Sequence, residues 1–185
     1  VQEAATLLLT LFELGREVTS VLDLDELLEK IPELISRLTP FKAFAVYLLD
    51  ERRRDLHIAY SVGYPDEARR SLRMKVGEGI VGAAVETGDS MLVDDVLLDP
   101  RYVPVVEHAR SELVVPLRRK KRVIGALNLL SPHVGQYTER DEAILKQFAA
   151  HVAVALENAR LFDRERQYSA TLETLAEIGH EVASI

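Results

Sequence analysis

The sequence contains no cysteine and no tryptophan among its 185 residues, and only 6% of its residues are aromatic. Without a thiol the chain has no disulfide, no cysteine-ligated zinc, no cysteine nucleophile and no thioether-linked chromophore. No hydrophobic run approaches the roughly 18 residues that a membrane-spanning helix needs. The first residues also lack the charged and apolar regions of a signal peptide. These absences predict a cytoplasmic protein without a membrane span in this stretch of chain.

Positive charge is also in the minority, since 30 acidic side chains outnumber 23 basic ones and give a net charge of −7. An acidic chain does not neutralise phosphates in bulk, so we expect no nucleic-acid partner. A hydrophobic content of 48% with 29% charged residues is typical of a folded domain rather than of a disordered chain. The length suits one domain with a core and some additional helix.

A short sequence motif occurs twice. Residues Thr10–Val21 read TLFELGREVTSV and residues Thr174–Ile185 read TLAEIGHEVASI, so that seven of twelve positions are identical. Both copies carry a glycine inside a helical pattern, where glycine costs about 1 kcal/mol relative to alanine. Two unrelated amphipathic helices are not expected to share it. We therefore expect a domain over residues 1–162, followed by a linker helix over 163–185 that leads into the start of a second copy.

The spacing of apolar residues predicts the secondary structure. Apolar residues recur at helical spacing over 2–20, and Asp23 begins a capping box that opens a second helix, in which Pro32 predicts a kink or a shifted boundary. The remaining elements are strands over 43–49, 56–60, 72–76, 111–117 and 123–130, and a helix from 139 to 162 with a heptad-like apolar seam. The polar stretch 163–167 interrupts this seam, which then resumes in a shifted phase.

Common catalytic and metal-binding patterns are missing. Residues Gly77–Gly82 read G-x-G-x-x-G, but the strand before them is half charged and the helix after them ends early, at Gly88. The five histidines have no metal-ligand spacing, and no nucleophile-elbow serine or P-loop lysine is present. The five cations of Arg118–Arg122 indicate a solvated turn rather than a binding patch. The sequence therefore predicts no active site in this chain.

Several motifs follow one another in an order that resembles GAF domains. They are GEGIVG at 77–82, ETG at 86–88, VDDV at 93–96, DPRY at 99–102, SELVVPL at 111–117, IGALNL at 124–129 and YTERD at 137–141. The resemblance covers about residues 10–162. It implies an α+β, GAF-like (PAS-related) fold with an antiparallel sheet of about six strands and the N- and C-terminal helices packed on one face. Loops on the other face would enclose a small-molecule pocket.

The same resemblance implies which residues border the pocket. They are Asp94, Asp95, Tyr102, Ser111 and Glu112. Apart from the resemblance, His108, in the loop before Ser111, is the one histidine that we consider as a ligand contact. An alternative for Asp94 and Asp95 is that they cap a short helix or turn at 96–102. Because the chain has no cysteine, a covalently attached bilin and the chemistry of the methionine-sulfoxide-reducing branch are both excluded, and no cofactor is evident. The Asn-Lys, Phe and Asp-Glu arrangement of cyclic-nucleotide-binding members is also absent.

The resemblance implies a non-catalytic sensory domain of a bacterial signal-transduction protein. In this hypothesis the domain binds a small molecule and passes the signal through a parallel homodimer to an output domain. That output would be a PP2C-type serine phosphatase, a diguanylate cyclase or a histidine kinase. The expected dimer contacts are the N-terminal helix together with Leu145, Phe148, Val152, Leu156 and Phe162. The alternative is a structural dimerisation or spacer domain whose pocket is filled by its own side chains.

Overall fold

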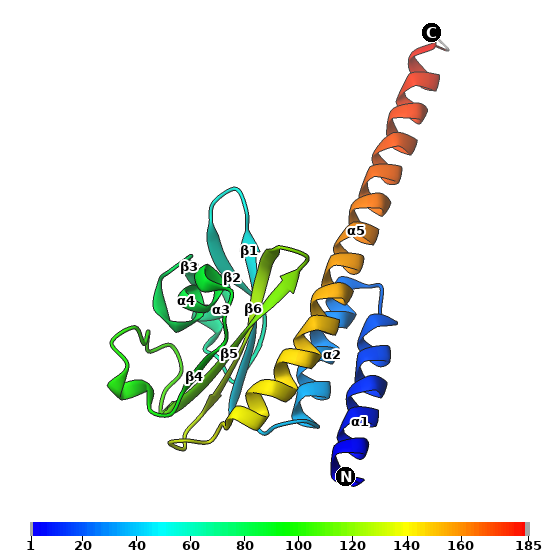
Figure 1. Ribbon diagram of the computed structural model, residues 1–185. Helices are drawn as coiled ribbons and strands as arrows, with labels where there is room; N and C mark the ends of the chain where they lie inside the picture. Colours follow the sequence, from blue (N-terminus) through cyan, green and yellow to red (C-terminus); the bar gives the residue numbers. More distant parts are fainter. Residues whose placement is uncertain (1, 184–185) are drawn as a thin grey trace.

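A six-stranded antiparallel sheet forms the centre of the molecule (Figure 1). The computed structural model describes the backbone of residues 2–183 and the side chains of residues 6–179. The strands follow the spatial order β3-β2-β1-β6-β5-β4. Their bounds are Ala43–Asp50 for β1, Asp55–Val62 for β2, Arg73–Lys75 for β3, Met91–Val93 for β4, Ser111–Arg119 for β5 and Arg122–Ser131 for β6.

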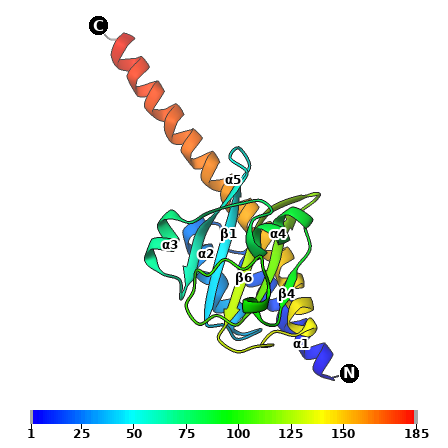
Figure 2. The same ribbon diagram turned by 90° about the vertical axis from the view of Figure 1, so that its left-hand side faces the viewer.

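Helices cover both faces of this sheet, as Figures 1 and 2 show. The helices α1 (Gln2–Thr19), α2 (Leu24–Ser36) and α5 (Glu139–Ala183) lie on one face. The short helices α3 (Asp66–Ser71), α4 (Gly79–Thr87) and the 3-10 helix η1 (Val96–Leu98) belong to the other side. The α+β fold with both terminal helices on one face is therefore confirmed.

The layered arrangement explains why β1 is apolar on both sides. Alternate side chains of a strand point to opposite faces. Phe44, Val46 and Leu48 accordingly join the core beneath α1, α2 and α5, whereas Ala45 and Tyr47 join a second core beneath α4 and η1. A strand with a core on each face has no place for alternating polar residues.

Helix α2 begins at the predicted cap. The backbone N–H of Glu26 donates to Asp23 Oδ1 at 3.0 Å, so the carboxylate satisfies one of the unpaired donors of the first turn. Pro32 lies buried inside the helix, which continues to Ser36. Proline removes one internal hydrogen bond, but the apolar face of α2 packs on both sides of it, and the helix does not end there.

The C-terminal helix α5 is continuous over 45 residues, which at 1.5 Å per residue amounts to about 68 Å. The polar stretch 163–167 does not interrupt the helix. Every described side chain from Asp163 onward is exposed, and this half of α5 projects away from the sheet (Figure 1). No helix in the described part of the chain combines the length and the hydropathy required to cross a bilayer.

Most of the α5 residues expected at the dimer contact lie in the core of the domain instead. Leu145, Phe148, Val152 and Leu156 have no exposed surface, because they pack in the core that α5 forms with the sheet, α1 and α2. They are enclosed by their own chain and cannot also contact a second copy. Phe162, by contrast, is 40% exposed. The expectation that all five form a dimer seam is thus corrected, since four of them are core residues.

Candidate functional site

Among the described residues, one carboxyl-bearing side chain is buried, that of Glu112. It is the second residue of β5, where it pairs with Val93 of β4 and Leu130 of β6, and it is only 3% exposed. It forms no ion pair with any described residue. Burial raises the pKa of Glu112 to about 8, and the nearby charge of Asp99 acts in the same direction. The carboxyl group is therefore neutral near pH 7.

Glu112 lies on the face of the sheet opposite the terminal helices, and buried polar side chains from neighbouring strands share this face. Tyr47 of β1 and Tyr64, which follows β2, belong to the core on the side opposite the terminal helices. The strand alternation of β6 places Asn128 on the same side, and its Nδ2 donates to the Tyr64 hydroxyl at 3.1 Å. Asn128 Oδ1 is buried without a hydrogen-bond partner. We call Glu112, Asn128, Tyr64 and Tyr47 the polar cluster.

Electrostatics keep this cluster uncharged. Burial raises the pKa of both Tyr47 and Tyr64 above the ordinary tyrosine value, so both phenols stay protonated. The side-chain amide of Asn128, as a hydrogen-bond partner, and the charge of Arg101 lower the pKa of Glu112, but burial is the larger effect. The cluster therefore offers one neutral acid, two phenols and one free amide oxygen, which are groups suited to hydrogen-bonding a polar ligand.

The segment from Asp94 to Arg110 lies next to the cluster and contains η1. Asp95 caps η1, because its Oδ1 accepts from the Leu97 backbone N–H at 3.2 Å. Its carboxylate also binds Arg110 through two contacts of 2.7 and 3.2 Å. These contacts support the capping alternative for Asp95. Asp94 is exposed, and its backbone carbonyl accepts from the Gly135 N–H at 2.8 Å.

The other predicted pocket residues are divided between the two faces of the sheet. Tyr102 packs half-buried against the same core as Tyr47, and burial together with the charge of Glu112 raises its pKa. His108 is exposed in a turn with a φ of 61°. Ser111 is fully buried, but the pleat of β5 puts it on the side of Leu113, the helix face. Only Glu112 and Tyr102 of the six come together.

Three residues of the polar cluster were not predicted from the sequence. Asn128 could have been noticed in the sequence, because it is the one residue with a polar side chain in the run Ile124–Leu130, which otherwise contains apolar residues and a glycine. Tyr47 and Tyr64 had none, because a tyrosine in an apolar stretch looks like an ordinary core residue. Among the described side chains, no three histidine, aspartate or glutamate groups are placed to hold a metal ion.

Comparison with known proteins agrees with this architecture. The family model of the GAF domain matches residues 21–157. A probable 3',5'-cyclic phosphodiesterase of Caenorhabditis elegans is 24% identical over 174 residues, covering 84% of this chain. The match takes up 24% of that relative, so the chain spans about a quarter of its length.

Solved structures show the same fold. The free methionine-R-sulfoxide reductase of Neisseria meningitidis, in complex with its substrate, has a TM-score of 0.75 at 27% identity, covering 86% of this chain and 93% of the other. The GAF domain of a phosphoenolpyruvate-protein phosphotransferase from Coxiella burnetii has a TM-score of 0.77 at 22% identity, covering 85% and 96%. The chain belongs to the GAF domain family, a regulatory and sensory fold of signalling proteins.

Proposed function

We propose that this GAF domain senses a small molecule at the polar cluster and transmits its binding through α5. The observation that carries the proposal is the buried Glu112, which has no charged partner within ion-pair distance among the described residues. A buried ionisable group without a charged partner costs free energy, and natural proteins retain such groups mainly at functional sites. Its presence beside a free Asn128 amide oxygen favours a ligand-binding role.

The chemistry of the cluster favours a ligand that donates hydrogen bonds or carries a cationic amino group. A cation opposite Glu112 would lower the pKa of the carboxyl and allow it to ionise, forming a charge-assisted pair. The substrate-bound relative acts on free methionine-R-sulfoxide. These 185 residues contain no cysteine, so we propose binding without thiol-dependent reduction.

Two contacts offer a route from the cluster to α5. Ser90, directly before β4, donates a hydrogen bond to Glu142 in the first turns of α5. At the other end of β5, Arg119 pairs with Glu157 of the same helix. A ligand that moves β4 and β5 would therefore also shift α5.

The output would pass through a parallel dimer on the projecting half of α5. Leu161 and Tyr168 follow one another at heptad spacing and are more than half exposed, and Leu172 continues this apolar side four residues further on. On α1, Leu8, Leu9 and Phe12 are also exposed. These residues replace the four buried ones in the proposed dimer contact.

A second GAF copy would follow this one in the proposed protein. Leu11 and Leu14 of α1 are 6% and 0% exposed, whereas the matching residues of the repeat, Leu175 and Ile178, are 59% and 51% exposed. A second copy would bury Leu175 and Ile178 as this one buries Leu11 and Leu14. The repeat's Val182, Ser184 and Ile185 have side chains outside the described residues. The proposed output remains a PP2C-type phosphatase, a diguanylate cyclase or a histidine kinase in a bacterial, cytoplasmic protein.

Native mass spectrometry of the gently purified domain tests the sensing function. We expect a bound small molecule on the wild type, loss of it in Glu112→Gln, and retention in Asp94→Asn, which removes an exposed carboxylate of the neighbouring segment. A wild type without bound molecule, from which a metabolite library also selects none, would contradict sensing.

The alternative function is a spacer with a filled pocket. One observation favours it: Glu112, Asn128, Tyr64 and Tyr47 are all less than 10% exposed, so the cluster is closed in this structure. A ligand could enter only if the 94–110 segment moved. Hydrogen exchange at 96–110, with and without the molecule found by mass spectrometry, distinguishes the two functions, because sensing requires that the molecule slows exchange there and a spacer does not.

A further inference from the structure

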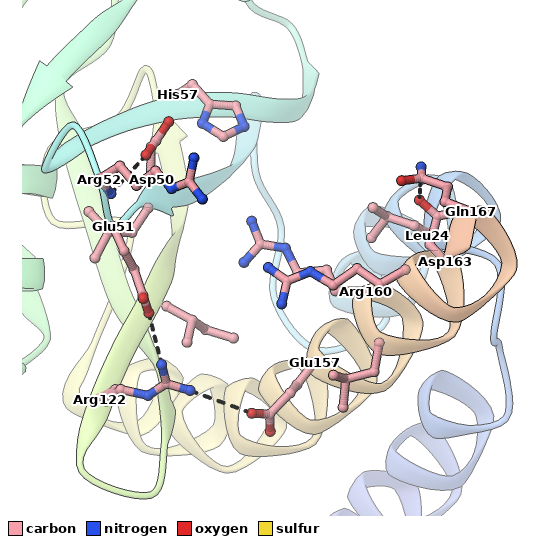
Figure 3. A pocket seen from close by; sticks show the side chains of 14 residues that line it. Leu24, Asp50, Glu51, Arg52, His57, Arg122, Glu157, Arg160, Asp163 and Gln167 are labelled. Atoms are coloured by element: carbon pink, nitrogen blue, oxygen red, sulfur yellow. Dashed lines mark hydrogen bonds and ion pairs between the residues drawn. The ribbon is translucent and has the colours of Figure 1, made fainter. Parts of the chain in front are cut away.

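A second candidate site lies on the helix side of the sheet, where α5 leaves the core. A cleft of about 630 Å³ separates α5 from the turn end of the β1–β2 hairpin (Figure 3). This volume lies within the range of small-molecule sites. Its apolar wall consists of Leu24, Leu49, Ile124 and Leu161, and the remaining lining side chains are polar or charged. Glu112 and its cluster do not contribute to it.

The carboxylates of the cleft already have partners among the described residues. These partners engage the carboxylate oxygens, although each carboxylate keeps its negative charge. Asp50 accepts from the backbone N–H groups of Arg52 and Arg53, Glu51 pairs with Arg122 at 3.0 Å, Glu157 pairs with Arg119 and Arg122, and Asp163 accepts from Gln167.

Three guanidinium groups of the cleft, in contrast, form no ion pair or hydrogen bond with any described residue. They belong to Arg160 and Arg164 on α5 and to Arg52 in the turn after β1. Figure 3 shows Arg160 extending from α5 toward the hairpin that carries Arg52 and His57. Arginines from two separate elements therefore converge on one cleft.

Of the three guanidinium groups, that of Arg160 has the surroundings least favourable to its positive charge. It is half-buried, and burial together with the positive charge of Arg164 lowers its pKa, while the charge of Glu51 acts in the opposite direction. The pKa of His57 is lowered by burial and by the charges of Arg73 and Arg160. An anion in the cleft would compensate both effects, because a negative charge stabilises the protonated form of each group.

The surroundings would attract anions even though the whole chain is acidic. Strands β1 and β6 are neighbours, so the turn at 51–54 and the turn at 120–121 lie at the same end of the sheet. Arg53, Arg54, Lys120 and Lys121 belong to these turns. These cations outnumber Glu51, the acidic residue of the two turns, and a local excess of positive charge around a cleft raises the rate at which anions arrive.

We propose that this cleft binds a small phosphate-bearing molecule, with the phosphate held by Arg160, Arg164 and Arg52. Guanidinium groups match phosphate oxygens with paired hydrogen bonds, which a set of three converging arginines can supply. The apolar wall at Leu24 and Ile124 would hold the organic part. Such a ligand would join the β1–β2 turn to α5 at the last residues before the helix projects from the domain.

Isothermal titration with inorganic phosphate and with phenyl phosphate, at physiological ionic strength, tests this site. We expect one saturable site and tighter binding of phenyl phosphate, because its ring can cover the apolar wall. Arg160→Gln and Arg164→Gln should each weaken binding about tenfold or more, since a charged hydrogen bond is worth at least one factor of ten. Arg164 is exposed, so its variant should fold normally.

Matched controls separate a built site from diffuse attraction. Lys121→Gln removes the same charge at the same end of the sheet but outside the cleft lining, and Arg140→Gln removes it near the start of α5. Both should change the affinity by no more than about twofold, within the scatter of exposed charges. Equal weakening in Lys121→Gln and Arg160→Gln, no saturable binding, or equal binding of citrate would overturn the proposal. Glu112→Gln should retain phosphate binding, so failure of the sensing site at Glu112 is distinguishable.

Discussion

Replacing Glu112 by glutamine should make the protein more stable above pH 5, although it removes a charged residue type from the proposed binding site. The pKa of Glu112 is about 8 in the folded protein, against an ordinary value of 4.5. Folding therefore takes up a proton between these two pH values. Because the folded state binds more protons than the unfolded state, the free energy of unfolding decreases as the pH rises from 4.5 to 8.

The size of the effect follows from the two pKa values. A difference of about 3.5 in pKa corresponds to about 5 kcal/mol at pH 8 and above, and the part reached at pH 7 is about 3 kcal/mol. Glutamine resembles the protonated carboxyl in shape and can still accept from Asn128, but it does not ionise. The variant should therefore match the wild type near pH 4.5 and exceed it by about 3 kcal/mol at pH 7.

Urea unfolding followed by circular dichroism, at half-unit steps from pH 4.5 to 8.5, measures this difference. With a slope of about 2 kcal/mol per molar urea, the midpoints should separate by about 1.5 M at pH 7. Asp94→Asn should keep the pH profile of the wild type. A constant difference between Glu112→Gln and the wild type across this range, or a wild type that gains on the variant as the pH rises, would refute a protonated Glu112.

Two further predictions concern packing and assembly. A methyl group at Gly125 would lie 2.1 Å from the Tyr47 backbone oxygen, so Gly125→Ala should cost several kcal/mol in chemical unfolding, about the range of the most damaging substitutions. Gly135→Ala, with open space but a φ of 63°, should cost only about 1 to 2 kcal/mol, and equal losses would contradict the clash. Combined Tyr168→Asp and Leu172→Asp should convert a dimer into a monomer in light scattering without changing the unfolding midpoint of the isolated chain; a persistent dimer would exclude this contact.

The terminal helices and the long hairpins were predictable because local patterns determine them. Asp23 begins α2 with the expected cap, and β5 and β6 pair across the charged turn that separates them. The helix α3 was not predicted, because the sequence DEARRS has no apolar stripe and none of its residues is buried. β4 has only three residues, too few to show alternation.

The C-terminal seam shows where a pattern is ambiguous. Apolar residues spaced by three and four form either an intramolecular core or a coiled coil, and the spacing alone does not distinguish them. The coiled-coil interpretation is wrong for Phe148 and Val152, which face the sheet and α1 rather than a second chain. Whether a helix face packs against its own domain or against a second chain depends on tertiary packing, which a short stretch of sequence does not determine.

The candidate site was only partly predictable for a similar reason. Glu112 came from the resemblance to GAF domains, which placed it beside a pocket but did not predict that its carboxyl group is buried. Because alternate side chains of a strand point to opposite faces, Ser111 and Glu112 lie on different sides of the sheet. A sequence motif that contains both residues does not show this difference. Tyr64 reaches the cluster from beyond the end of β2, so its position depends on how the chain turns after that strand.

The continuity of α5 has a consequence for any domain attached to its far end. An α-helix turns by about 100° and advances by 1.5 Å with each residue. Adding one residue within 163–183 would therefore swing an attached domain by more than a quarter of a revolution while hardly lengthening the connection. Adding seven would bring it back to within about 20° of its original bearing. In this protein the angular phase of the connecting helix, more than its length, would determine how two neighbouring domains face each other.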